Sequence, residues 1–93
     1  MNLIQHYING KIYKGSSSRK GKVFNPATGA QESEVILGTK SDLDHAVENA
    51  KTAFEKWSQV TPLQRARIIF KYKELIEKNY DELTKLIVSE HGK

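Results

Sequence analysis

The hydrophobic period of the chain changes once, at Ser41, and this change constrains the fold more than any other feature. Before Ser41, apolar residues alternate with polar ones in short runs that end at Gly, Pro or Asn, as β-strands do. After Ser41, apolar residues recur every three or four positions, as on one face of an α-helix. The sequence therefore predicts an α+β chain, with β-strands and loops over 1–40 and two or three amphipathic helices over 41–93.

Asn9 and Gly10 predict an antiparallel β-hairpin over about residues 4–14. The pair separates two short runs of alternating apolar and polar residues. Both central residues of a type I′ turn have positive φ, which Asn and Gly tolerate. The chain is thus expected to reverse direction between Ile8 and Lys11.

Between the predicted hairpin and the first helix, loop and turn residues mark the ends of two further strands. Gly15–Gly21 is rich in small polar residues and predicts a flexible, disordered loop. Val23-Phe24 predicts a short strand that ends at Asn25-Pro26, because Pro lacks the N–H that a β-ladder needs. Thr28-Gly29 predicts a turn, and residues 34–37 predict the last strand.

The first predicted helix spans about 42–58. Ser41 is the expected N-cap, with Asp44 at the third helical position. Its predicted buried face consists of Leu43, Ala46, Val47, Ala50, Ala53, Phe54 and Trp57.

Stronger start signals precede the second predicted helix, over about 62–78. Thr61 is the expected N-cap, Pro62 fits the first helical position, and Gln64 completes a capping box. Asn79 predicts a left-handed stop. A third helix is expected to open with Asp81 and Glu82, to bury Leu83, Leu86 and Ile87, and to end at Gly92.

The second helix carries apolar residues on two sides. Leu63, Ala66 and Phe70 lie on an arc whose Phe70 is about 160° from the centre of the main stripe, at ~100° per residue. The main stripe consists of Ile68, Ile69, Tyr72, Leu75 and Ile76. A chain this short has a small core of its own. We therefore expect self-association through exposed apolar helix faces.

The sequence contains no complete motif for catalysis or metal binding. Gly15–Lys22 has the wrong spacing for a phosphate loop, and Val23 stands where a Ser or Thr is required. The chain contains no Cys, and its His residues lack zinc-binding spacing. Two pairs of carboxylates could act as an acid and a base, namely Asp42 with Asp44 and Asp81 with Glu82. Each pair is instead predicted to lie in the first turn of a helix, where the helix dipole favours a negative charge. The His residues, predicted to lie on the surface, are His6, His45 and His91.

Nucleic-acid and membrane binding are both disfavoured. The net charge of +4 and the basic cluster on the second helix permit an acidic partner. However, Lys73 with Glu77 and Glu74 with Lys78 can neutralise this face, and no aromatic residues interleave to stack bases. The basic residues are Arg65, Arg67, Lys71, Lys73 and Lys78. No apolar run approaches the ~20 residues that span a bilayer, and the start of the chain has no basic targeting segment, so a cytoplasmic protein is expected.

Several motifs occur in an order that is informative as a set. They are His6–Lys11, Phe24–Gly29, Asp44–Val47 with Ala50-Lys51 and Ala53–Trp57, Thr61-Pro62 with Arg65–Arg67, and Glu90–Lys93. This set resembles the N-terminal region of the aldehyde dehydrogenase superfamily. Arg65–Ile68, Phe70–Glu77 and Glu90–Lys93 are most similar to its methylmalonate-semialdehyde dehydrogenase branch.

The resemblance implies NAD-dependent oxidation of malonate or methylmalonate semialdehyde through a cysteine thioester, with coenzyme A accepting the acyl group. It implies a cofactor domain, a catalytic domain and an oligomerisation arm, in a homo-oligomer. The family's nucleophilic Cys, general-base Glu, oxyanion Asn and nicotinamide loop would all follow Lys93. We therefore expect 1–93 to be one N-terminal fragment, a partial cofactor domain with no catalytic, cofactor-binding or metal residue, inactive alone and binding neither NAD nor CoA.

A second hypothesis is a free-standing helical interaction module from a truncated gene, whose exposed helix faces bind another protein. Gene context would separate the two, because a downstream reading frame with the missing Cys and Glu favours a fragment. Nucleic-acid binding is the third and least favoured hypothesis.

Overall fold

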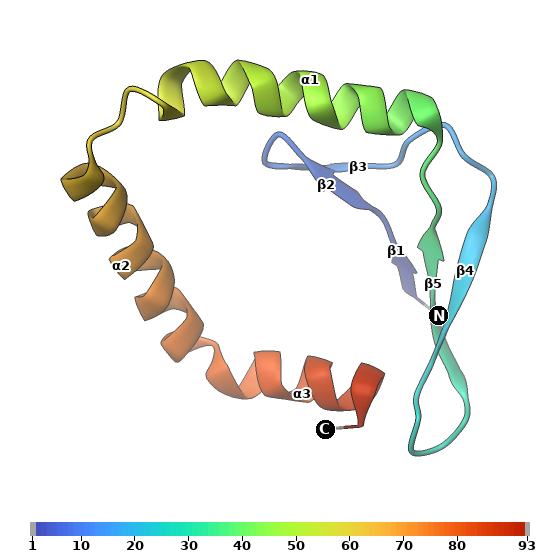
Figure 1. Ribbon diagram of the computed structural model, residues 1–93. Helices are drawn as coiled ribbons and strands as arrows, with labels where there is room; N and C mark the ends of the chain where they lie inside the picture. The colour runs from blue at the N-terminus through green and yellow to red at the C-terminus, as the bar shows by residue number, and fades with distance from the viewer. Residues whose placement is uncertain (1, 93) are drawn as a thin grey trace.

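The computed structural model describes residues 2–92, in which five short strands precede three helices (Figure 1). The strands are β1 (Asn2–Ile4), β2 (His6–Ile8), β3 (Lys11–Tyr13), β4 (Lys20–Phe24) and β5 (Gln31–Ile36). The helices are α1 (Lys40–Trp57), α2 (Pro62–Lys78) and α3 (Tyr80–His91). The predicted α+β class and order of elements are confirmed.

A three-stranded mixed sheet has the order β1-β5-β4. β5 lies in the middle, parallel to β1 and antiparallel to β4. Both β4 and β5 begin three residues earlier than predicted, because pairing between them continues over polar residues with weak strand propensity of their own. Ile36, at the end of β5, is 3% exposed and is the one buried hydrophobic residue among 2–92.

β2 and β3 form the predicted hairpin as a separate two-stranded sheet. Tyr7 lies opposite Ile12, and the turn has φ of 56° at Asn9 and 72° at Gly10. The predicted start at residue 4 was wrong, because Ile4 belongs to β1 and pairs with Val35 of β5.

The loop predicted to be disordered is instead held by hydrogen bonds. The backbone N–H of Ser16 donates to Oδ1 of Asp42 at 3.2 Å. The Arg19 guanidinium donates to the carbonyl of Gly38 at 3.1 Å. Small polar residues predicted disorder here, but the loop bonds to Asp42 in the first turn of α1 and to Gly38 in the segment that joins β5 to α1.

α1 begins two residues earlier than predicted, with Thr39 and not Ser41 as its N-cap. The Thr39 hydroxyl accepts the N–H of Asp42 at 3.1 Å, and the Asp42 carboxylate accepts the N–H of Thr39 at 2.9 Å. Asp44, predicted at the third position, instead pairs with Lys40 at 3.1 Å. Both Thr39 with Asp42 and Ser41 with Asp44 have capping-box spacing, and only the first pair also contacts the preceding loop.

α2 has the predicted bounds, and Thr61 and Gln64 form the predicted capping box. Asn79 is not left-handed, since its φ is −108°. Its side-chain amide donates to the carbonyl of Leu75 at 2.8 Å, which closes α2 without a positive φ. Gly92 ends α3 with φ of 78°, as predicted, whereas Lys93 lies outside the described residues.

The three helices curve away from the β-strands and return to them, so that the chain forms an open ring (Figure 1). α1 runs along the hairpin, α2 crosses the far side, and the end of α3 approaches Pro26 in the turn between β4 and β5. The molecule measures 47 × 35 × 16 Å, with a radius of gyration of 16.9 Å. A compact domain of this length would have a radius of about 12 Å. Residues 2–92 contain no helix long and apolar enough to cross a membrane.

Candidate functional site

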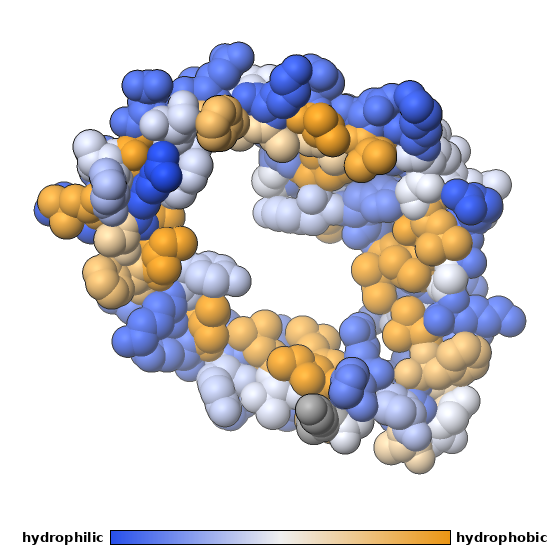
Figure 2. Space-filling model, viewed as in Figure 1, coloured by the Kyte–Doolittle hydropathy of each residue, from blue (hydrophilic) through white to orange (hydrophobic). Residues whose placement is uncertain are grey.

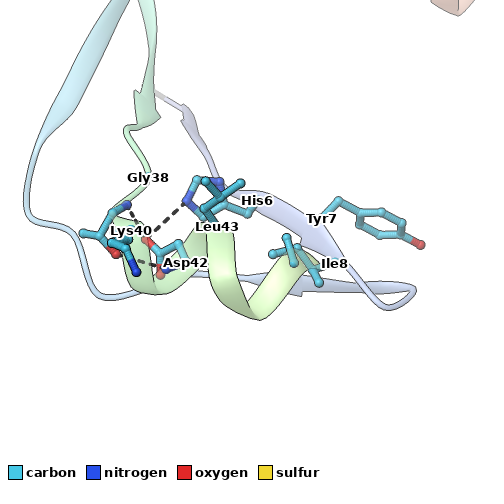
Figure 3. Close-up of a pocket in the computed structure, with 9 residues that line it drawn as sticks. His6, Tyr7, Ile8, Gly38, Lys40, Asp42 and Leu43 are labelled. Carbon is cyan, nitrogen blue, oxygen red and sulfur yellow. Dashed lines mark hydrogen bonds and ion pairs between the residues drawn. The ribbon is translucent and has the colours of Figure 1, made fainter. Parts of the chain in front are cut away.

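The one buried ionisable side chain among the described residues is Asp42, which is 4% exposed. It lies where the hairpin, the loop after β3 and the start of α1 meet (Figure 3). Its carboxylate accepts hydrogen bonds from the backbone N–H groups of Thr39 and Ser16. The Ser16 and Thr39 hydroxyls lie 3.2 Å apart beside it.

These donors favour the ionised form of Asp42. The backbone N–H of Thr39 is the main cause that lowers the pKa of this carboxyl below 3.8. The Thr39 hydroxyl, the Ser16 N–H and the charge of His6 act in the same direction, while burial acts against them. Asp42 is therefore a carboxylate at neutral pH, and its position suits the positive end of the helix dipole.

His6 reaches the same place from β2. Its Nε2 lies 3.9 Å from Oδ2 of Asp42, and the two side chains point toward each other (Figure 3). Nε2 is buried without a hydrogen-bond partner, and the side chain is 24% exposed. The prediction of a surface residue was therefore wrong for His6. No local signal indicated its partner, because Asp42 lies 36 positions further along the chain.

The other two histidines are exposed, as predicted. The ring of His45 on α1 stacks on Tyr13 of β3, with centroids 4.4 Å apart and planes 17° apart. Tyr13 also lies 6.3 Å from the ring of His6. These contacts dock the hairpin on α1, whereas His91 lies at the end of α3.

A hollow of about 600 Å³ opens beside Asp42. It is lined by His6, Tyr7, Ile8, Gly38, Thr39, Lys40, Asp42, Leu43 and Ala46. Anion binding at the start of α1 would bring a second negative charge against Asp42, which already accepts the nearby N–H groups. Within residues 2–92, no group of three His, Cys, Asp or Glu residues could hold a metal ion. The hollow thus has the chemistry of a structural junction.

The residues with partial similarity to a phosphate loop, Gly15–Lys22, have structural roles in and beside this junction. The N–H of Ser16 is bound to Asp42, and Lys20 to Lys22 belong to β4. Asp81 and Glu82 lie in the first turn of α3, as predicted. Lys20 pairs with the carboxylate of Glu34 at 3.7 Å across the sheet.

Apolar side chains of the helices are exposed to an unusual degree. On α1, Leu43 is 62% exposed and Phe54 is 65% exposed. On α2, Leu63 and Phe70 are each 63% exposed on one side, and Ile69 is 58% exposed in the main stripe. Figure 2 shows an opening through the ring with apolar side chains along much of its rim. The predicted burial of these stripes therefore does not occur within this chain.

Charge on α2 is partly neutralised, as predicted. Lys73 lies 3.5 Å from Glu77, whereas the predicted pair of Glu74 and Lys78 is not among the ion pairs of the described residues. Arg65 turns away from this face. Its guanidinium donates to the carbonyl of Trp57 at 2.9 Å and lies 5.2 Å from the centre of the indole ring.

The Aldehyde dehydrogenase family matches residues 12–93, and the chain belongs to this family. Malonate-semialdehyde dehydrogenase 1 of Shouchella clausii is 48% identical over 90 residues, which are 97% of this chain and 18% of that protein. Malonate-semialdehyde dehydrogenase 2 of Bacillus anthracis is 43% identical over 91 residues, 98% of this chain and 19% of that protein. The chain thus spans about a fifth of the length of the relatives it matches.

Solved structures agree with these relatives. Methylmalonate-semialdehyde dehydrogenase from Oceanimonas doudoroffii superposes with a TM-score of 0.92 and 40% identity, covering 98% of this chain and 18% of that one. A protein from Sinorhizobium meliloti 1021, described as a methylmalonate-semialdehyde dehydrogenase in complex with NAD, gives 0.93 and 40%, covering 96% and 18%. The resemblance predicted from the motifs is confirmed.

Proposed function

We propose that this chain is the opening part of an NAD-dependent, CoA-acylating malonate- or methylmalonate-semialdehyde dehydrogenase that acts in the cytoplasm as a homo-oligomer. The observation that carries the proposal is the simultaneous match of sequence and fold to a methylmalonate-semialdehyde dehydrogenase, at 40% identity over 98% of the chain. In such an enzyme the chain supplies outer strands and helices of the cofactor domain.

Alone, the chain is proposed to be inactive and to bind neither NAD nor CoA. Thioester chemistry needs a thiolate nucleophile, and the sequence contains no Cys. The residues present also do not fit the pyrophosphate of NAD. The start of α1, which follows β5, would be the natural place for a phosphate, but the buried carboxylate of Asp42 lies there.

A chimera tests this proposal. The matched 90 residues of the Shouchella clausii enzyme are replaced by this chain, and NADH formation from malonate semialdehyde is followed with and without CoA. We expect CoA-dependent turnover from the chimera and none from the same enzyme without the replaced segment. A chimera that folds and assembles but has no activity would contradict the proposal.

A second experiment uses the isolated chain to test the proposed lack of NAD binding and activity. Calorimetric titration with NAD is expected to give no saturable heat, and aldehyde oxidation is expected to be absent. Micromolar NAD binding would contradict the proposed lack of a cofactor site in these residues.

A further inference from the structure

The turn between β2 and β3 places two groups side by side that can react with each other. The side-chain amide of Asn9 and the backbone N–H of Gly10 form no hydrogen bond among residues 2–92. A Cβ added to Gly10 would meet nothing within 4 Å, so the space around this peptide group is open. Gly10 has no Cβ of its own, and nothing hinders the approach of its nitrogen to the Asn9 side chain.

The hairpin that carries this pair is weakly held. β2 and β3 have three residues each, and within residues 2–92 they pair only with each other, apart from the main sheet. A two-stranded hairpin is marginally stable by itself. Side-chain contacts such as the stack of Tyr13 on His45 dock it on α1. The turn is therefore expected to open locally more often than the whole chain unfolds.

The other asparagines among the described residues lack this combination. The Asn25 side chain is hydrogen-bonded, and the next residue, Pro26, has no N–H. The amides of Asn49 and Asn79 each donate to the backbone carbonyl four residues earlier, at 2.8 Å. Asn2 is part of β1 and precedes a bulky leucine. Among these residues, the combination of a free amide, a free neighbouring N–H and a following glycine thus occurs at Asn9.

We propose that Asn9 is a site of spontaneous deamidation, in which the Gly10 nitrogen attacks the Asn9 side chain. When the turn opens, rotation about the Cα–C bond of Asn9 brings this nitrogen to Cγ. A bond forms between the nitrogen and Cγ, the nitrogen gives up its proton, and the side-chain amino group takes up a proton and leaves as ammonia. The product is a cyclic imide. The reaction is intramolecular, so it requires no binding surface beyond the turn itself.

Water then opens the imide at one of its two carbonyl carbons. Cleavage of the bond between the nitrogen and Cγ gives an aspartate. Cleavage at the backbone carbonyl gives an isoaspartate, whose main chain runs through the former side chain and is longer by one carbon. Either product places a carboxylate near Glu48 and Lys56 of α1, which border the same hollow as Asn9. The isoaspartate also lengthens the turn, and since loop length sets the turn type, it weakens the pairing of β2 with β3.

The test incubates the full chain at neutral pH and follows each asparagine by peptic digestion and mass spectrometry. Digestion in acid stops further deamidation. We expect the exchange of NH for oxygen to be at least tenfold faster at Asn9 than at Asn49 or Asn79. Part of the product should be isoaspartate, which an enzyme that methylates isoaspartyl carboxylates detects. Gly10→Ala is the matched variant, because its added Cβ hinders the attacking nitrogen and should slow the reaction several-fold.

The same chain unfolded in guanidinium chloride gives the rate at Asn9 without a turn. If Asn9 stays intact in the folded chain, the proposal is overturned, whether or not it reacts when unfolded. Equal rates at Asn9 and Asn49 in the folded chain also overturn it, and so does a Gly10→Ala rate no lower than that of the parent. None of these outcomes involves catalysis, so they are independent of the chimera experiment.

Discussion

The carboxylate of Asp42 accepts the backbone N–H of Ser16 at 3.2 Å, and 26 positions of sequence separate the two residues. The same carboxylate accepts the N–H of Thr39 and so caps α1. One side chain therefore fixes both the path of the loop after β3 and the first residue of the helix. His6 brings the hairpin to the same group, at 3.9 Å.

Stability is expected to depend on pH through Asp42. Its pKa in the folded chain lies below 3.8, so its contribution is complete above the unfolded pKa and is lost as pH falls through the folded value. Asp42→Asn should therefore lower the thermal midpoint by several degrees at pH 7 and by less at pH 3. The control is Asp44→Asn, which removes an exposed carboxylate. A difference between Asp42→Asn and the parent that stays constant from pH 7 to pH 3 would contradict this assignment.

Thr39 is expected to matter for stability, and Ser41 is not. Removing the Thr39 hydroxyl leaves the N–H of Asp42 without its cap and should cost about 1 kcal/mol. Ser41→Ala removes a hydroxyl that caps nothing. Urea titrations of Thr39→Ala and Ser41→Ala compare the two directly. Equal losses in both variants would show that the helix starts elsewhere.

The start of α1 also shows where sequence reasoning stops. Asn9 with Gly10, and Thr61 with Gln64, are local signals that contain their own partners, so the hairpin turn and α2 were predicted correctly. Two overlapping capping boxes precede α1, and their sequences do not distinguish them. The choice depends on Ser16, which the chain brings there only when it folds.

Non-local pairing explains the other differences. Ile4 was included in the predicted hairpin because no turn residue separates it from β2, and only the parallel pairing of β1 with β5 sets it apart. The buried site at Asp42 was missed for the same reason, since His6 has no nearby partner in sequence. The exposed arc containing Phe70 was predicted, because helical periodicity alone places it.

Gly15 and Gly10 are expected to respond differently to Ala. Both have positive φ, 76° and 72°, which costs an Ala about 1 kcal/mol at either site. At Gly10 a Cβ meets nothing within 4 Å, whereas at Gly15 it would lie 2.8 Å from the carboxylate oxygens of Asp42. Gly15→Ala should therefore be clearly more destabilising in thermal unfolding. A smaller loss than that of Gly10→Ala would mean that the loop does not approach Asp42.

Nucleic-acid binding is expected to be weak and unselective. Lys73 is already paired with Glu77 at 3.5 Å, so the basic face of α2 is partly neutralised. Affinity for duplex DNA or for RNA should stay in the generic range of ~10⁻⁴ to 10⁻⁶ M and fall steeply with salt. Fluorescence anisotropy with labelled oligonucleotides of different sequence measures both. Nanomolar, sequence-selective binding would make the basic helix face a recognition surface.

Arg65 is expected to hold the corner between α1 and α2. Its guanidinium bonds the carbonyl of Trp57 and lies over the indole ring, two contacts that one ammonium group cannot reproduce together. Arg65→Lys should cost about 1 kcal/mol. Since Trp57 is the single tryptophan, its emission should move to longer wavelength and become more open to iodide quenching. Arg67→Lys is the control, because Arg67 is exposed and has no hydrogen bond or ion pair among residues 2–92. If the two variants quench alike, the corner is set by the four-residue link between the helices, and the open ring depends on that link instead of on Arg65.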